Sequence, residues 1–370
     1  MATTFFAQLS KILLSPFALV YGIIVGTRRF LYRTKLLRSS RFDIPTISVG
    51  NLNVGGAGKT PHIEYLIRLL QPYLNVSVLS RGYKRHTEGF RMVELDHTAV
   101  DVGDEPLQYK LKYPSVPVAV SEKRAYAIPQ MLYRHSDIQT ILLDDAFQHL
   151  AVQPYLNILL TEFSDPFTKD YLLPAGRLRD WRTTYRHADI IIVTKCPFDL
   201  QDSEKQTFIQ DINPYHYQRI YFSYFNYGAP YPLFRHRTPP SRLFRDVPSV
   251  FQTFDAETEV LLVCGIAKTD YLLEYLSSKV KSVTTMAFED HRLFSNYDVA
   301  QFKRLYETLT GKKKMIITTE KDATRLLLHQ DYLVENQLDI HVLPIEVAFH
   351  FEEGQLFDAD IKNVLLNFKV

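Results

Sequence analysis

The sequence predicts an α/β protein in which a domain with a mostly parallel sheet is followed by a second, smaller α/β domain. Two observations lead to this prediction. Short apolar runs rich in β-branched residues alternate with segments of helical length, as in βαβ units. A stretch with five prolines then separates one such alternating series from another. The 370 residues are enough for two domains, each with its own buried core.

The first alternating series predicts the larger of the two sheets. Its apolar runs are continuous, which is typical of strands buried on both faces. Residues 62–70, between the first two runs, place Ile63, Leu66, Ile67 and Leu70 on one helical stripe. The runs of this series are residues 46–50, 76–80, 116–121, 140–145, 157–162 and 189–195.

The second series predicts the smaller domain, with strands at residues 259–266, 282–288, 314–321 and 339–347. The stretch before it contains Pro230, Pro232, Pro239, Pro240 and Pro248, which exclude a regular helix or the interior of a sheet. We therefore expect an inter-domain connection there. The predicted boundaries are residues 1–42 for an N-terminal helix and basic arm, 43–228 for the larger domain, 229–255 for the connection and 256–370 for the smaller domain.

The N-terminus combines an apolar run with basic residues. Residues 12–26 are mostly apolar, which is shorter than the roughly 20 residues of a spanning helix. Lys11 precedes the run, and Arg28 and Arg29 follow it, which is not the charge order of a secretory signal. The pattern favours a helix in a membrane interface, with its arginines on anionic headgroups. The alternative is an ordinary core helix with a solvated basic tail, and Pro16 marks a kink or the first helical turn.

Composition excludes several classes of function. There are two cysteines, Cys196 and Cys264, and no CxxC pair, so a disulfide framework or a thiolate metal site is not expected and a reducing cytosol fits best. The twelve histidines have no spacing typical of a zinc site. The net charge is +2, but seven of the 43 basic residues lie before Asp43, and the other 36 face 41 acidic residues. This local excess argues against a general nucleic-acid binder.

The segment "SVGNLNVGGAGKTP", residues 48–61, predicts a phosphate-binding loop. It lies between a predicted strand and an amphipathic helix, where backbone N–H groups and the helix N-terminus face a bound anion. Lys59 would reach the β- and γ-phosphates, and the Thr60 hydroxyl would hold Mg²⁺. Asn53 occupies the position of the motif's first glycine, and asparagine tolerates left-handed backbone better than most residues. We therefore expect a P-loop NTPase domain.

An acidic pair ends a later strand of the same series. The run "TILLDD" closes with Asp144 and Asp145, like a Walker B element whose carboxylate holds Mg²⁺. An aspartate here could instead cap the next helix. One of the two could cap while the other faces the metal.

These pieces together resemble the tetraacyldisaccharide 4'-kinase family, the lipid A 4'-kinases of Gram-negative bacteria. The first segment is similar to the family signature, including its non-glycine residue at position 53. Seven further segments follow in the family's order and cover nearly the whole chain. They are "LSRGYKR" (79–85), "VGDEPLQ" (102–108), "LLDDAFQH" (142–149), "LLPAGRLRD" (172–180), "ADIIIVTK" (188–195), "FEDHRLF" (288–294) and "TTEKDATRL" (318–326).

The resemblance implies transfer of the ATP γ-phosphoryl group to the 4'-hydroxyl of a lipid A disaccharide 1-phosphate. It implies ATP and Mg²⁺ as cofactors and a peripheral or monotopic place on the cytoplasmic face of the inner membrane. It implies no nucleic-acid partner, and we infer no protein partner. The residues that it implies for ATP binding are Asn53, Val54, Gly55, Gly56, Ala57, Gly58, Lys59 and Thr60, with Thr60, Asp144 and Asp145 around the metal.

Two residues far apart in the sequence match the family's proposed catalytic pair. Asp104 in "GDEP" matches the catalytic aspartate, and His291 in "EDHRLF" matches its partner, with Lys59 acting beside them on the phosphates. A carboxylate oriented by a histidine could accept the proton of the sugar hydroxyl. Without the resemblance, Asp104 would be a loop aspartate and His291 a surface histidine.

A second group of residues is expected near the substrate or around the carboxylates. Gln148 and His149 could contact substrate, orient the acidic pair, or only pack. Arg81, Arg177 and Arg179 could grip nucleotide phosphates or the substrate's 1-phosphate, or lie solvated in loops. Ala146, Arg177 and Asp180 depart from the family pattern, which leaves the local loop geometry open.

Two other functions fit parts of the pattern. A membrane-associated P-loop ATPase could switch conformation without phosphorylating a small molecule. A GTPase would normally show an N-K-x-D motif, and residues 193–199 do not have its spacing. A non-enzymatic peripheral membrane protein would not need Lys59, Thr60 and the acidic pair. ATP turnover that depends on the lipid precursor separates the kinase from both.

Overall fold

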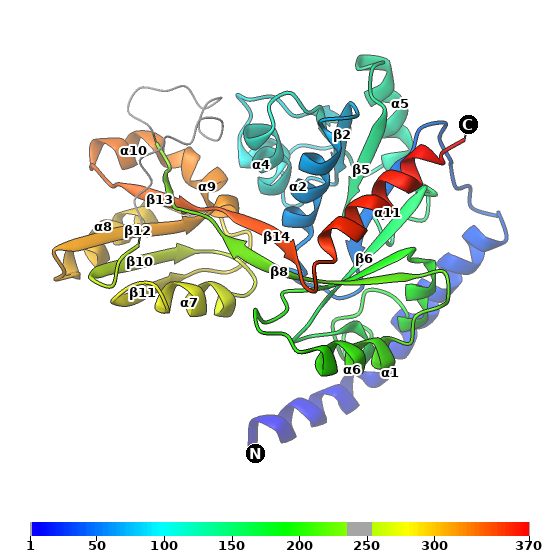
Figure 1. Cartoon of the computed structure of the whole chain (residues 1–370), viewed down its shortest axis with the longest axis horizontal. Helices are drawn as coiled ribbons and strands as arrows, with labels where there is room; N and C mark the ends of the chain where they lie inside the picture. The colour runs from blue at the N-terminus through cyan, green and yellow to red at the C-terminus, as the bar shows by residue number, and fades with distance from the viewer. Residues whose placement is uncertain (1, 235–253, 370) are drawn as a thin grey trace. The chain divides into compact units, whose positions relative to one another are not determined.

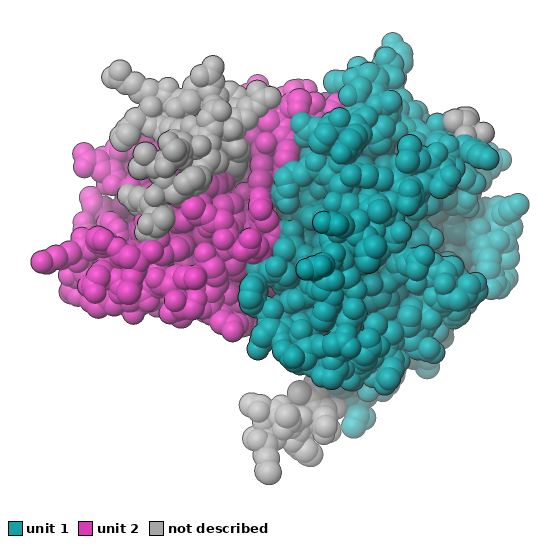
Figure 2. Space-filling view, in the orientation of Figure 1, with its two compact units in different colours: residues 1–79, 123–225, 347–370 teal, residues 80–122, 226–346 magenta. Residues whose placement is uncertain are grey.

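The computed structural model describes residues 2–234 and 254–369, and its side chains from residue 11 onwards (Figure 1). Contacts divide the chain into two compact units (Figure 2). Unit 1 consists of residues 1–79, 123–225 and 347–370, and unit 2 of residues 80–122 and 226–346. This division differs from the contiguous ranges expected from the sequence, because each unit takes one segment from the other's range.

Unit 1 is built on a parallel sheet whose neighbouring strands are β8–β7–β6–β1–β5–β2. Strand β1 lies between β5 and β6 and pairs with both in parallel. The carboxyl ends of these three strands therefore lie next to one another. All six residues of β1 are buried, as expected for a strand covered on both faces. The strands are β1 Thr46–Asn51, β2 Val76–Ser80, β5 Thr140–Asp144, β6 Leu156–Glu162, β7 Ile190–Thr194 and β8 Arg219–Tyr227.

Among the described residues of unit 1, four α-helices and two short 3-10 helices follow the N-terminal helix. One apolar cluster of its core joins Leu52, Leu159, Ile191 and Phe222 to side chains from the loop after β6. The helices are α2 Lys59–Leu70, α5 Arg124–Arg134, α6 Asp202–Ile212 and α11 Gly354–Leu366, with η1 Phe167–Lys169 and η2 Arg182–His187.

The last residues of the chain belong to unit 1. The run predicted as a single strand at 339–347 is divided at Pro344 into β13 Ile340–Leu343 and β14 Ile345–Phe349, and β14 pairs with β8. Proline has no N–H for a continuous ladder, which explains the break. Helix α11 then binds the unit through two hydrogen bonds. Tyr65 of α2 donates to Asp358 at 2.7 Å, and Tyr221 of β8 donates to Asp360 at 2.6 Å.

The N-terminal helix α1 runs from Ala2 to Arg33 with Pro16 inside it. Pro16 has no N–H to donate to the Ile12 carbonyl, which instead accepts a hydrogen bond from the Ser15 hydroxyl at 2.7 Å. Residues 11–33 are long and apolar enough to cross a membrane by length and composition alone, a criterion that core helices and signal sequences also meet. Only 11% of that apolar window is buried, so this helix is not a core helix.

One side of α1 is fixed to unit 1 by a few polar contacts. The Trp181 indole donates to the Gly22 carbonyl at 2.9 Å, and its ring fills the space where a Cβ of residue 22 would lie. Arg29 pairs with Asp180. Asp180, one of the departures from the family pattern, therefore anchors the helix.

Unit 2 has a five-stranded sheet in the order β11–β10–β12–β13–β9. Its strands are parallel except for β9, which pairs antiparallel with β13 at the edge. The strands are β9 Tyr231–Pro232, β10 Thr258–Cys264, β11 Ser282–Ala287, β12 Lys313–Thr319 and β13 Ile340–Leu343. The helices are α7 Asp270–Ser277, α8 Asn296–Thr308, α9 Glu320–Leu326, α10 Gln330–Glu335 and the 3-10 helix η4 Leu327–His329.

The predicted connection, residues 229–255, is only partly described. Residues 235–253 lie outside the described residues, and β9 lies within the part that is described. Pro232 is in that strand, which lies at the edge of the sheet and not in its interior. Proline is tolerated there because β9 is an edge strand.

Residues 80–122 of unit 2 carry β3 Arg91–Met92, α3 Ala99–Val102, α4 Asp104–Lys112 and β4 Val118–Val120. The strand predicted at 116–121 is present as β4, and it pairs with β3 in the antiparallel direction. Helix α4 packs against α9, and Lys112 of α4 pairs with Glu320 of α9 at 2.6 Å. This contact explains why the segment belongs to unit 2.

Candidate active site

The predicted phosphate loop connects the end of β1 at Asn51 to the first residue of α2, Lys59. Two of its glycines have left-handed or related backbone, Gly55 with φ of 126° and Gly58 with φ of 81°. A Cβ on Gly58 would also come within 2.8 Å of the Phe225 ring. These two positions therefore require glycine, and they turn the loop onto the N-terminus of a helix twelve residues long, where orphan N–H groups favour an anion.

Asn53 does not have the left-handed backbone conformation that was expected to explain an asparagine in place of the motif's glycine. It forms an isolated antiparallel bridge with Leu178, and its amide donates to Asp170 at 2.9 Å. The next N–H, of Val54, donates to the carbonyl of Arg177 at 2.7 Å. The loop is thus held along the segment around residue 178, and a side chain at position 53 is needed for one of these bonds.

The far side of the loop is fixed by buried polar groups. Thr194 at the end of β7 donates to the Ala57 carbonyl at 3.0 Å. His62 of α2 lies 2.7 Å from the Gly58 carbonyl through Nδ1 and 3.1 Å from the Ser223 hydroxyl through Nε2. Burial lowers the pKa of His62 to about 4, so the ring is neutral at pH 7 and serves as a structural support.

Lys59 lies in a cluster that contains one of the two predicted metal carboxylates. Its Nζ is 3.0 Å from Asn51 Oδ1 and 3.7 Å from Asp145 Oδ1. Arg179 binds the same carboxylate with both terminal nitrogens, at 2.8 and 2.9 Å, and also reaches Asn51. Burial raises the pKa of Asp145, but the charges of Lys59 and Arg179 outweigh it and hold this pKa well below its usual range.

Asp144 is the last residue of β5 and is buried. The carbonyls of Asp144 and Asp145 both accept hydrogen bonds from the Arg124 guanidinium. Thr60 stands in the first turn of α2, directly after Lys59. Asp144 lies opposite Val49 in the parallel register of β5 and β1, so strand pairing brings the acidic pair to the end of the sheet where the loop begins.

Of the remaining residues predicted near this loop, Gln148, Arg177 and Arg179 contact it or the residue that precedes it. Gln148 donates to the Asn51 carbonyl at 2.7 Å. The Arg177 side chain binds Asp165 and Asp170, which raise its pKa, while its backbone pairs with the loop. His149 is half-buried in the turn after β5, and its N–H donates to Ala146. Arg81 is exposed, at the start of the unit 2 segment 80–122.

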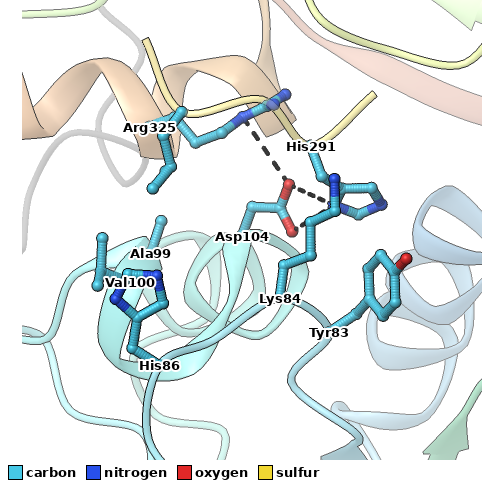
Figure 3. Close-up of a pocket in the computed structure, with 9 residues that line it drawn as sticks. Tyr83, Lys84, His86, Ala99, Val100, Asp104, His291 and Arg325 are labelled. Atoms are coloured by element: carbon cyan, nitrogen blue, oxygen red, sulfur yellow. Dashed lines mark hydrogen bonds and ion pairs between the residues drawn. The ribbon is translucent and has the colours of Figure 1, made fainter. Parts of the chain in front are cut away.

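Asp104 and His291, 187 residues apart, are in direct contact in unit 2 (Figure 3). Asp104 is the first residue of α4 and is 4% exposed. His291 Nδ1 lies 2.9 Å from Asp104 Oδ2 and 3.1 Å from Oδ1. His291 has φ of 59°, a left-handed conformation in the turn after β11. Both residues line a cavity of about 340 Å³ together with Tyr83, Lys84, His86 and Arg325.

Cations lie behind the Asp104 carboxylate. Lys321 of α9 has its Nζ 4.0 Å from Asp104, 3.1 Å from Glu105 and 3.1 Å from Asp290. Arg325 of the same helix lies 3.8 Å from Asp104. Burial raises the pKa of Asp104, but the hydrogen bond from His291 and the charge of Lys321 hold it well below its usual range. Asp104 is therefore ionised at neutral pH.

Ligand atoms of Asp104, Glu105 and His291 lie within 4.8 Å of one another, a spacing that a metal ion could use. The Lys321 ammonium already lies among them, 3.0 Å from His291 Nε2 and 3.1 Å from Glu105. The Lys321 ammonium therefore lies where a metal ion would bind to these three residues, and we assign no metal ion to them.

Comparisons with known proteins place this chain among relatives of one kind. A model of the family described as "Tetraacyldisaccharide-1-P 4'-kinase" matches residues 10–365. The chain belongs to this family. A relative from Bacteroides thetaiotaomicron named tetraacyldisaccharide 4'-kinase is 44% identical over 349 residues, covering 94% of this chain and 91% of the relative. One of the same name from Parabacteroides distasonis is 43% identical over 355 residues, covering 95% and 94%.

A solved structure agrees with this assignment. It is described as an "apo" form of LpxK from Aquifex aeolicus in complex with ATP. It matches with a TM-score of 0.70 and 28% identity, covering 96% of this chain and 99% of that chain. Three predictions from the sequence motifs are thereby confirmed: the family, the α/β fold with two domains, and the assignment as a kinase.

Sequence reasoning missed several residues that shape the site of this kinase. Asn51 accepts hydrogen bonds from Lys59 and Arg179, and Arg124 binds the carbonyls of the acidic pair. Asn51 lies in the phosphate-loop motif, and Lys321 and Arg325 lie in "TTEKDATRL". These motifs therefore marked the segments, but they did not indicate what the three residues do. Arg124 lies outside the quoted motifs, and its role depends on strand β5 bringing the acidic pair beside α5.

Proposed function

We propose that this kinase transfers the γ-phosphoryl group of ATP to the 4'-hydroxyl of a lipid A disaccharide 1-phosphate. The contact between Asp104 and His291 carries the proposal, because it places an ionised carboxylate, held by a histidine, at the wall of a cavity. The names of the relatives support the same class of acceptor and the same 4'-position on it. A conformational switch would have no need of such a pair.

Residues 53–60 bind ATP in this proposal. Gly55 and Gly58 shape the backbone around the β- and γ-phosphates, and the N-terminus of α2 faces their charge. Lys59 neutralises charge on the γ-phosphate, where its point charge is most effective as the bond to ADP breaks. Asn51 holds the Lys59 ammonium at 3.0 Å, so little reorganisation is needed when ATP binds.

The donor set beside the loop fits Mg²⁺. Carboxylate and hydroxyl oxygens are the ligands that this ion prefers, and Asp144, Asp145 and Thr60 supply them. When bound, Mg²⁺ would neutralise charge on the β- and γ-phosphates. We propose that Asp144 faces the ion and that Arg179 keeps Asp145 ionised and oriented, since its fork binds both carboxylate oxygens.

Asp104 accepts the proton of the acceptor hydroxyl in this proposal. The hydroxyl O–H bond breaks as its oxygen bonds to the γ-phosphorus, and the electron pair of the broken P–O bond remains on ADP. His291 donates through Nδ1 to Asp104 and so fixes the direction of the carboxylate. The proposed proton acceptor lies in unit 2, and the residues proposed to bind ATP lie in unit 1.

We propose supporting roles for the remaining predicted residues. Arg81 is exposed and available for a phosphate of the substrate, and the half-exposed Arg177 could share that task when it leaves Asp165. Gln148 donates to the Asn51 carbonyl and His149 donates through its N–H to the Ala146 carbonyl, and we propose that both residues hold the backbone beside the acidic pair.

We propose a location on the cytoplasmic face of the inner membrane. Apolar side chains of α1 such as Ile12, Leu13 and Phe17 are well exposed, and Arg28 and Arg33 follow them. An exposed apolar helix with basic residues at one end is typical of attachment to anionic membranes. An acylated acceptor would then be met where it resides.

The test is transfer of labelled γ-phosphate to tetraacyldisaccharide 1-phosphate in detergent with Mg²⁺. We expect label in the lipid with the wild type, and loss of at least about 100-fold with Lys59→Ala and with Asp104→Asn. Lys303→Ala, on the surface of α8, is the matched control and keeps full activity. Hydrolysis of ATP without labelled lipid would instead favour the ATPase switch.

A further inference from the structure

Helix α1 has one covered face and one exposed face. Within residues 11–29 the exposed apolar side chains include Leu13, Phe17 and Ile23, each more than half exposed. The covered positions recur every three or four residues, as one stripe of a helix does. They are Leu14, Ala18, Tyr21, Gly22, Val25, Gly26 and Arg29. One side of the helix therefore packs on unit 1, and only the other is free to meet a membrane.

The covered face of α1 contacts the segment 179–181. The Tyr21 hydroxyl donates to the Arg179 carbonyl at 2.9 Å. The Trp181 indole donates to the Gly22 carbonyl, also at 2.9 Å. The helix thus binds a backbone oxygen at one end of the segment and a side chain at the other end.

Asp180 lies between these two contacts. Its side chain is 4% exposed and pairs with Arg29, whose Nε donates to Oδ2 at 2.7 Å. The other oxygen, Oδ1, accepts from the Trp181 N–H at 2.8 Å. A buried carboxylate that loses its cation is strongly destabilised. The segment would therefore have to shift if the Arg29 guanidinium were removed.

The same segment carries a guanidinium of the proposed ATP site. Arg179 binds Asn51 Oδ1 at 2.7 Å, and it binds Asp145 through both terminal nitrogens. Asn51 Oδ1 in turn lies 3.0 Å from the Lys59 ammonium. A route of three direct contacts therefore joins Tyr21 to Lys59.

A second route runs through the turn after β5. The Arg28 guanidinium donates to the Gln148 carbonyl at 3.3 Å, and the Gln148 amide donates to the Asn51 carbonyl at 2.7 Å. The two routes meet at Asn51, the last residue of β1 before the phosphate loop. Contacts from α1 therefore reach the start of the loop through two segments that are separate in the sequence.

We infer that Tyr21 and Arg29 are positioning residues of the proposed ATP site. They hold residues 179–181 so that the Arg179 guanidinium stays on Asn51. The inference rests on the proposed function, because residues 53–60 must bind ATP for this position to matter. Helix α1 then has two tasks, one for each face. Linkage requires that any ATP affinity gained from the covered face is returned as a tighter contact of α1 when ATP binds.

The wild type alone provides the first test. Trp181 is the only tryptophan of the 370 residues, so the fluorescence of the whole kinase reports on the contact with α1. The full-length protein in detergent is titrated with a non-hydrolysable ATP analogue and Mg²⁺. Quenching of Trp181 by acrylamide should fall about twofold at saturation, because its side chain is 39% exposed and a tighter contact covers it further.

Variants of the covered face provide the second test, by titration calorimetry with the same analogue. Arg29→Met should raise the Kd about 5- to 10-fold, and Tyr21→Phe, which loses one hydrogen bond, about two- to threefold. Adding Asp180→Asn to Arg29→Met should return the Kd to within about threefold of the wild type, because no buried carboxylate is then left unpaired. A purely structural role would lower the melting temperature without changing the Kd of the folded protein.

Ile23→Ser is the matched control, because Ile23 follows Gly22 but lies on the exposed face. It should leave the Kd for the analogue within about twofold, since no contact to residues 179–181 is lost. It should bind vesicles of phosphatidylcholine and phosphatidylglycerol in equal parts at least about threefold more weakly, as less apolar surface enters the membrane. Tyr21→Phe should bind these vesicles like the wild type.

Several results would overturn the inference. One is unchanged quenching of Trp181 in the wild type at saturating analogue, which needs no variant to fold. Another is an unchanged Kd in both Arg29→Met and Tyr21→Phe, and a third is an equal loss of ATP affinity in Ile23→Ser. If the wild type binds the analogue but transfers no phosphate to the lipid, the proposed function fails, while the measured ATP affinities still decide the inference.

Discussion

Each of the two units buries a carboxylate among cations, and they do so with different partners. In unit 1, Asp145 is bound by the two-pronged guanidinium of Arg179 and lies near Lys59. In unit 2, Asp104 is bound by the imidazole of His291, which in turn accepts from Lys321. A guanidinium carries a permanent charge, whereas an imidazole has one proton to direct. The first arrangement suits a fixed negative charge, and the second suits proton transfer.

The largest expected effect separates the two clusters by ligand. Lys59→Met should raise the Kd for ATP about 10- to 100-fold, since a charged hydrogen bond to phosphate is worth about 1.5–3 kcal/mol. Asp104→Asn should leave this Kd within about twofold. Titration calorimetry with a non-hydrolysable ATP analogue measures both. A similar loss of ATP affinity in the two variants would mean that the clusters do not divide the work in this way.

A second prediction compares conservative exchanges in the two clusters. Arg179→Lys keeps the charge but loses the fork that binds both oxygens of Asp145, so we expect about tenfold lower turnover and an unfolding free energy lower by about 1–2 kcal/mol. Lys321→Arg also keeps the charge and should cost less than about threefold in turnover. Steady-state kinetics and urea unfolding give both values. The comparison is weakened if Arg179→Lys is the milder change.

A third prediction concerns stability against pH. The pKa of Asp104 in the folded protein is below its usual value of 3.8, so its ionised form stabilises the fold above about pH 4. Asp104→Asn should therefore lower the unfolding free energy by about 1.5–3 kcal/mol at pH 7. The difference from the wild type should shrink as the pH falls from 5 towards 2.

Asp145→Asn should show the same sign with a smaller difference, because a third of the Asp145 side chain is exposed. Melting temperatures of the three proteins between pH 3 and 7 provide the measurement. A gap that widened at low pH would contradict the sign.

The smallest expected effect is at Asn53. The general phosphate-loop motif has glycine here, but Asn53 is bonded to Asp170 and lies in an extended bridge. Asn53→Gly should therefore lower the unfolding free energy by about 1 kcal/mol, with ATP affinity nearly unchanged. An increase in stability or affinity would show that the motif's glycine is needed for its backbone freedom.

Much of the fold could be predicted from local pattern. The strands from β1 to β7 in unit 1 match apolar runs closely, and the loop before α2 was identified by its glycines and by "GKT". Local pattern could not assign residues 80–122 to unit 2, because that depends on α4 packing against α9 more than 200 residues later. Nor could it divide residues 339–347 between two sheets, although Pro344 marked the place.

The candidate site shows the same limit. The family resemblance predicted that Asp104 and His291 act as a pair, and in the structure the two side chains are in contact. The reason offered for Asn53 was wrong, since it assumed a left-handed backbone where the structure has a bridge to Leu178. The parts played by Lys321 and Asn51 depend on which polar atoms remain to be satisfied once the chain is packed, and the order of residues alone does not contain that information.

The return of residues 347–370 to unit 1 has a consequence for how the protein is made. The ribosome releases the phosphate loop before unit 2 and α11 after it, yet Tyr65 in the helix that follows the loop bonds to Asp358 of α11. Unit 1 must therefore wait, incomplete, while every residue of unit 2 is synthesised. A premature stop codon between unit 2 and α11 would spare unit 2 and damage the part proposed to bind ATP.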